Sequence, residues 1–168
     1  MPGHAIIAQV VRRAVAIAAT VTTGLLAGGM LLIRGVLVPF WRGISPREFR
    51  DWFASHSNRI RRVMVPLGAA AATSSAITAL FEVAADDGAT ASSAVAAVSA
   101  AGVGAITYAV NEPANEQFVR EDLDDDVTTD LLGRWSRWHD LRVLLGVVGA
   151  LAAAWTLLCA RTRRGAPS

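Results

Sequence analysis

The sequence contains no lysine, a single cysteine and little charge of either sign. All 16 basic residues are arginines, and charged residues make up 18% of the 168 positions. An average soluble domain carries about 25% charged residues. One cysteine allows no internal disulfide, so Cys159 indicates nothing about the redox compartment. With 53% hydrophobic residues, this composition argues against an ordinary soluble domain.

The arginines do not form a basic stripe. The isoelectric point is near 9.5, but the formal net charge is only +2, and the arginines are spread over the polar segments and tails. A nucleic-acid-binding domain gathers its positive charge on one face or along one helix. The sequence therefore indicates no nucleic-acid partner.

Four long stretches contain no charged residue: 14–33, 63–81, 90–110 and 143–160. An α-helix needs about 20 apolar residues to cross a hydrocarbon core of about 30 Å. A soluble four-helix bundle would instead carry charges along one face of each helix. The sequence predicts an all-α integral membrane four-helix bundle, with residues 1–168 forming a single domain in contact with the lipid bilayer. An even number of spans places both termini on one side.

The second and third stretches are rich in alanine and serine, which favours positions inside the bundle. Small residues at helical spacing allow membrane helices to approach closely, and Gly24 with Gly28, and Ser75 with Thr78, have that spacing. The alternative is that small residues are simply abundant in this chain. No feature of the sequence specifies an oligomeric state.

The first connection predicts a short amphipathic helix. Ser45, Pro46 and Glu48 have the order of a capping box with proline at the first helical position. Phe49 and Phe53 then fall on one face, together with Trp52. This pattern is typical of a helix that lies at the membrane interface.

The second connection, 82–88, is short and acidic, which predicts an antiparallel hairpin. The third, 111–142, is long and polar, and its acidic middle lacks the glycine that a calcium loop requires, so we expect a solvated loop. More arginines flank the first and third connections than the termini. The positive-inside rule then places these connections in the cytoplasm.

Polar residues follow the third stretch at helical spacing. On a continuing helix, Tyr108, Asn111, Asn115 and Phe118 would share one face, and Pro113 would bend the helix. One interpretation is a functional site. The other is that the asparagines only join neighbouring helices by hydrogen bonds.

A second polar cluster precedes the fourth stretch, where Trp135, Trp138, His139 and Arg142 fall on one predicted face. Tryptophan and arginine also occur at membrane boundaries for purely structural reasons. His139 fits that alternative less well, because imidazole exchanges protons near neutral pH. His56 could join His139 in this cluster, but two histidines are too few for a metal site, and no bound metal is expected.

Arg34 lies near the end of the first stretch. A guanidinium at that depth either reaches the interface or pairs with an acid. Glu82 and Glu112 are the candidate partners.

These residues resemble the DUF1772 family of small four-span membrane proteins, also called anthrone-oxygenase-like. The similarity covers nearly the whole chain and rests on three places. They are the glycine-containing span 24–39 followed by Ser45-Pro46, the run Asn111-Glu112-Pro113-Ala114-Asn115, and Trp135 to Arg142 with His139. Glu112 stands where relatives often have an apolar residue.

The resemblance implies a possible activity. Some members oxidise anthrones to anthraquinones without a conventional redox cofactor, with molecular oxygen as co-substrate. By that resemblance no cofactor is predicted, His139 would be the base, and Asn111 and Asn115 would donate hydrogen bonds to a developing phenolate. Arg142 would stabilise the anion. A small aromatic substrate would contact Tyr108, Trp135 and Trp138.

The alternative is a non-catalytic membrane helper, a lipid-binding protein or a carrier. An apolar pocket on which the polar side chains converge would favour the enzyme, whereas divergent side chains would favour the alternative. For either function we expect a multi-pass protein of a bacterial plasma membrane.

Overall fold

The computed structural model describes residues 2–85, 88–120 and 122–162. The helices form four rods. The first joins α1 (Pro2–Leu32), the π-helical turn η1 (Ile33–Leu37) and α2 (Val38–Gly43). The second is α3 (Pro46–Ala84), the third joins α4 (Thr90–Ile106), the π-helical turn η2 (Thr107–Asn111) and α5 (Glu112–Phe118), and the fourth is α6 (Asp125–Thr162).

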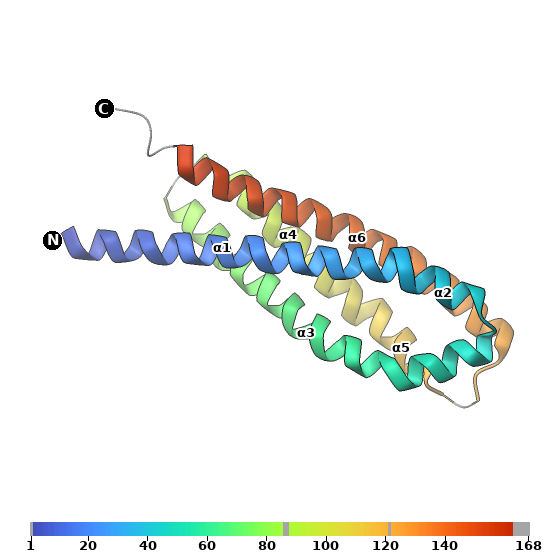
Figure 1. Ribbon diagram of the computed structural model, residues 1–168. Helices are drawn as coiled ribbons and strands as arrows, with labels where there is room; N and C mark the ends of the chain where they lie inside the picture. Colours follow the sequence, from blue (N-terminus) through green and yellow to red (C-terminus); the bar gives the residue numbers. More distant parts are fainter. Residues whose placement is uncertain (1, 86–87, 121, 163–168) are drawn as a thin grey trace.

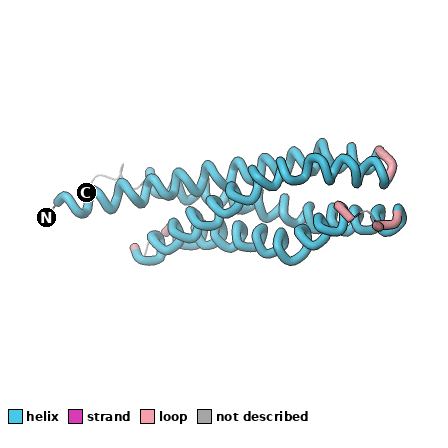
Figure 2. Tube along the Cα trace, turned by 90° about the horizontal axis from the view of Figure 1, so that it is seen from below, coloured by secondary structure: helices cyan, strands magenta, loops and turns pink. Residues whose placement is uncertain are grey.

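All four rods are long and apolar enough to cross a membrane, and each contains one of the four uncharged stretches. The rods pack side by side as one elongated bundle (Figure 1). The start of α1, the end of α6 and the α3–α4 connection lie at one end, here the terminal end. The α2–α3 and α5–α6 connections lie at the other, here the connection end, and described loops occur only at these ends (Figure 2). The predicted four-helix membrane bundle is confirmed.

Large apolar side chains point outward from the rods. Leu80, Val98 and Leu151 are 70%, 72% and 67% exposed. Many of the buried residues within the spans are small, such as Ala71, Ala96, Ser99 and Ala153. Lipid solvates exposed apolar side chains, and small residues let the helices approach. This distribution is that of an integral multi-pass membrane protein.

The expectation that the second stretch lies inside the bundle was wrong. The apolar window of α3 is only 17% buried, against 39% for that of the first rod, while the windows of the third and fourth rods are both 28% buried. Gly24 and Gly28 also have no neighbour within 4 Å of an added Cβ, so they mediate no close approach. Close approach occurs at Gly149, where a Cβ would lie 3.0 Å from the Cβ of Ser99. Because glycine and alanine are abundant in these helices, their spacing alone does not show which of them face a neighbouring helix.

The capping box at the start of α3 is confirmed. Ser45 Oγ accepts from the Glu48 amide at 3.3 Å, and the Ser45 amide donates to Glu48 Oε2 at 2.9 Å. The separate interfacial helix, however, was wrong. No glycine or proline interrupts residues 54–62, so α3 continues unbroken into the second span. Phe49 and Phe53 are buried against Phe118 inside the bundle.

The third connection is polar, as expected, but most of it is helical rather than a long loop. α5 ends at Phe118 and α6 begins at Asp125. Arg120 donates to both carboxylate oxygens of Asp122, which lowers the pKa of that carboxyl. Asp125 lies in the first turn of α6, where a negative charge interacts favourably with the helix dipole. Part of the acidic run therefore serves to start a helix.

Candidate functional site

A pocket of about 380 Å³ lies among all four rods, between the middle of the bundle and the connection end. Its lining residues from α1, η1, α2 and α6 are all buried. The exposed lining residues come only from the second and third rods: Arg61, Ala69, Ala101, Ala105 and Tyr108. The pocket therefore opens sideways between α3 and the α4–η2 segment, towards the apolar outer surface of the bundle.

An aromatic cluster closes the pocket towards the connection end. The ring of Trp41 lies 5.4 to 5.9 Å from those of Phe49, Trp52, Phe53 and Trp135. Trp41, Phe53 and Trp135 also line the pocket. The rings separate the pocket from the aqueous end of the bundle and leave a largely apolar cavity.

Both π-helical turns lie beside the pocket, which Ile33 of η1 and Tyr108 of η2 line. A π turn accommodates an extra residue and often occurs at functional sites. The extra residue in η2 changes which side chains share a face. Tyr108, Glu112 and Asn115 line the pocket, whereas Asn111 does not.

His139 of α6 is fully buried and held on two sides. Its Nε2 lies 3.0 Å from the carbonyl oxygen of Met30, and its ring stacks on Trp135 with 4.8 Å between centroids. A carbonyl only accepts, so Nε2 carries the hydrogen and Nδ1 of the neutral ring keeps a lone pair. Nδ1 is buried and has no hydrogen-bond partner among the described residues. The site therefore contains a base whose ring is fixed in orientation and whose Nδ1 is available to accept a proton.

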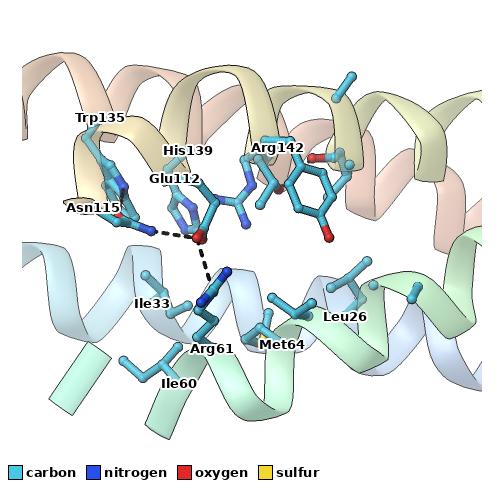
Figure 3. A pocket seen from close by; sticks show the side chains of 18 of the residues that line it. Leu26, Ile33, Ile60, Arg61, Met64, Glu112, Asn115, Trp135, His139 and Arg142 are labelled. Atoms are coloured by element: carbon cyan, nitrogen blue, oxygen red, sulfur yellow. Dashed lines mark hydrogen bonds and ion pairs between the residues drawn. The ribbon is translucent and has the colours of Figure 1, made fainter. Parts of the chain in front are cut away.

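A hydrogen-bonded chain fixes the wall beside His139 (Figure 3). Trp135 Nε1 donates to Asn115 Oδ1 at 2.9 Å, and Asn115 Nδ2 donates to Glu112 Oε1 at 3.2 Å. Glu112 Oε2 in turn lies 3.1 Å from Arg61 Nε. The chain joins α6, α5 and α3 across the pocket.

Arg142 lies one turn after His139 and is 9% exposed. Its guanidinium interacts electrostatically with Glu112, which Figure 3 shows beside it. Its Nε is buried with no hydrogen-bond partner in the described part of the chain. This guanidinium retains hydrogen-bonding capacity for a ligand.

Five of the seven candidate site residues meet at the pocket: Tyr108, Asn115, Trp135, His139 and Arg142. Asn111 and Trp138 are not among its lining residues. Asn111 is buried, with both amide atoms unpartnered among the described residues, and Trp138 is 43% exposed.

The sequence analysis assigned no role in the site to Arg61 or the Met30 carbonyl, and it considered Glu112 only as a candidate partner of Arg34. An acid at the end of an apolar stretch was the available signal for Glu112. A backbone carbonyl leaves no signal in a sequence. Arg34 pairs with Asp140, not with Glu82 or Glu112, because those acids pair with Arg12 and Arg61.

His56 stacks on Trp52 and is not among the pocket-lining residues. Its Nδ1 lies 2.8 Å from the Trp52 carbonyl oxygen. Within the described ranges, no group of three or more His, Cys, Asp and Glu side chains is placed to hold a metal ion.

Residues 52–152 match the family model described as anthrone oxygenase. The matched segment includes every pocket-lining residue of α4, η2, α5 and α6. No curated protein and no solved structure matches the chain. Because the match covers more than half of the 168 residues, the chain belongs to the anthrone oxygenase family, also known as DUF1772.

Proposed function

We propose that this protein is an oxygenase that converts an anthrone-like phenolic or polycyclic aromatic substrate to the corresponding quinone with molecular oxygen, without a further cofactor. The observation that carries the proposal is His139 Nδ1, a buried and unpartnered base in an apolar pocket. Buried polar atoms normally find a hydrogen-bond partner, and an exception in a pocket suggests a substrate.

The chemistry needs a base more than a redox group. The methylene carbon of an anthrone is acidic, because the resulting carbanion is delocalised over the rings and the carbonyl oxygen. His139 Nδ1 takes one methylene proton, and the electron-rich carbanion is then oxidised by molecular oxygen, forming a carbon–oxygen bond. The peroxide anion takes the proton back from His139, and the hydroperoxide then loses water, so that CH₂ and O₂ give C=O and H₂O. Four electrons leave the carbon, and oxygen accepts all four.

The other side chains have separate roles. Arg142 stabilises the negative charge that develops on the substrate oxygen, in surroundings where electrostatic interactions are strong. Trp135 and Trp41 provide flat walls for a planar ligand. The side-chain amide of Asn115 is already hydrogen-bonded to Glu112 and Trp135, so we assign this residue a positioning role. Roles for Asn111 and Trp138 in binding substrate stay predictions.

The pocket supports the enzyme over a helper, lipid-binding or carrier protein. The polar groups converge on one apolar cavity, which the non-catalytic alternative did not lead us to expect. The sideways opening suits a substrate dissolved in the bilayer. We further propose a bacterial plasma membrane location with the arginine-rich connection end in the cytoplasm.

To test the proposal, the purified full-length protein in lipid nanodiscs is incubated with anthrone. Oxygen consumption and anthraquinone absorbance measure the rate of oxidation. We expect His139→Ala to lower kcat about 100-fold, because general-base catalysis contributes on this scale. His56→Ala is the matched control, since this histidine lies on the same side of the bundle outside the pocket lining. A wild-type rate no faster than spontaneous oxidation would overturn the proposal, as would an undiminished rate in His139→Ala.

A further inference from the structure

The charged side chains lining the pocket do not balance. Among the described lining residues, Arg61 and Arg142 each contribute a positive charge, and Glu112 contributes the single negative charge. Glu112 forms an ion pair with Arg61 at 3.1 Å and also interacts with Arg142, so one carboxylate serves two guanidinium groups. His139 is neutral or adds further positive charge. The lining therefore carries a net charge of at least +1.

Most of this excess charge is located at the buried end. Arg61 is 60% exposed in its side chain and lies at the mouth of the pocket. Arg142 is only 9% exposed, and its Nε has no hydrogen-bond partner in the described segments. A buried charge without full compensation is unfavourable, particularly within a membrane. A ligand that brings a negative charge to Arg142 would relieve this cost.

The proposed reaction does not by itself supply that charge. When His139 takes a proton from a neutral substrate, the substrate becomes negative and the imidazole becomes positive. The transfer occurs inside the pocket, so the net charge of the pocket with its contents is unchanged. Only a ligand that is already ionised on arrival compensates Arg142.

We propose that the substrate is a planar aromatic acid, whose carboxylate binds Arg142 while its rings lie against Trp135. This inference rests on the proposed function for the aromatic part of the substrate. The planar guanidinium presents paired N–H donors that match a carboxylate, and such charge-assisted pairs are among the strongest hydrogen bonds in proteins. Arg142 thereby selects the substrate, in addition to stabilising charge during the reaction.

The test measures binding rather than turnover. An anthraquinone carboxylate and the matching neutral carboxamide are titrated separately into the full-length protein in uncharged nanodiscs, and quenching of tryptophan fluorescence reports occupancy. We expect the carboxylate to bind the wild type about tenfold more tightly or better, because hydrogen bonds to a charged group have this strength. Arg142→Gln should reduce the preference to less than about twofold, whereas Arg142→Lys should retain part of it. Arg137→Gln is the control, because Arg137 is exposed on the same helix.

Equal affinity of the wild type for the two ligands would overturn the inference, and so would an unchanged preference in Arg142→Gln. If Arg142→Gln does not fold, the test rests on the wild type and Arg142→Lys. A carboxylate preference that Arg142→Lys keeps in full would exclude paired recognition by the guanidinium and overturn the inference. A third ligand, laurate, separates an aromatic acid from a lipid acid. Displacement of the aromatic carboxylate by laurate at similar concentrations would overturn the aromatic part.

The inference and the proposed function fail separately. A carboxylate preference that depends on Arg142, without oxidation of either anthrone or an anthrone carboxylate, supports the binding site and overturns the oxygenase. Oxidation with the same kcat/KM for an anthrone carboxylate and its carboxamide supports the oxygenase and overturns the acid recognition.

Discussion

At the terminal end of the bundle, buried polar side chains are paired between helices, whereas at the connection end several are not. Glu82 accepts from Arg12 at 3.0 and 2.5 Å, and Ser92 lies 2.8 Å from the hydroxyl of Thr156. Around the pocket, the unpartnered buried groups of the described residues are His139 Nδ1, Arg142 Nε, Trp41 Nε1 and the Asn111 amide. Away from the pocket, the described residues include one such atom, Ser75 Oγ.

The difference distinguishes polar groups that stabilise the fold from polar groups that remain available to bind a ligand. An unsatisfied buried polar group costs about 1 to 3 kcal/mol, so one alone is tolerable and several together need a reason. At the terminal end the paired groups stabilise the packing of the helices. At the connection end, Trp41, His139 and Arg142 line a cavity, which is the expected arrangement when a ligand completes their hydrogen bonds, whereas Asn111 is not among the lining residues.

Glu82→Gln should produce the largest loss of stability and leave oxidation nearly unchanged. The carboxylate is 1% exposed and pairs with Arg12, whose side chain is 29% exposed. We expect the free energy of unfolding to fall by about 2 kcal/mol, less than for a fully buried pair because Arg12 is partly solvated. Reversible unfolding in mixed detergent micelles measures this loss, and the anthrone oxidation rate should stay within about twofold of wild type. A large loss of oxidation without destabilisation would break the comparison.

Glu112→Gln should strengthen binding of an acidic ligand. The substitution removes the negative charge that competes with a ligand carboxylate for Arg142, while an amide oxygen remains to accept from Asn115. We expect the anthraquinone carboxylate to bind about fivefold more tightly, or by about 1 kcal/mol. The neutral carboxamide is the matched control and should bind unchanged. Weaker binding of both ligands would show instead that Glu112 maintains the shape of the pocket.

Ser92→Ala and Ser75→Ala should have the smallest effects, with opposite signs. Ser92 loses a hydroxyl contact with Thr156, which should lower the free energy of unfolding by about 0.6 kcal/mol. Ser75 Oγ is buried without a partner among the described residues, so its removal should be neutral or stabilising. Equal destabilisation by both substitutions in the micelle assay would mean that pairing does not distinguish the two sites.

The spans and the capping box were predictable because each rests on a local pattern. Uncharged stretches of about 20 residues specify membrane helices. Ser45 and Glu48 cap a helix through contacts three residues apart. The family resemblance was likewise carried by short motifs, and the family match confirms it.

The details of the pocket were not predictable, because they depend on helix register and on backbone atoms. The extra residue of the π turn 107–111 replaced Asn111 by Glu112 on the pocket side, which regular helical spacing does not foresee. Trp138 was assigned to the same face as His139 by spacing alone, yet it lies outside the lining. The carbonyl of Met30, which orients His139, belongs to a helix 109 positions away in sequence.

The distinction between the two ends is tested most directly at His139 itself, by His139→Phe, which keeps an aromatic ring in the space but removes the base. Oxidation rate and free energy of unfolding are measured on the same preparation. We predict that oxidation falls about 100-fold while the free energy of unfolding stays within about 1 kcal/mol of wild type, because the substitution removes an unsatisfied buried nitrogen together with the hydrogen bond to the Met30 carbonyl. Retained oxidation with a clear loss of stability would show that His139 serves the fold and not the reaction.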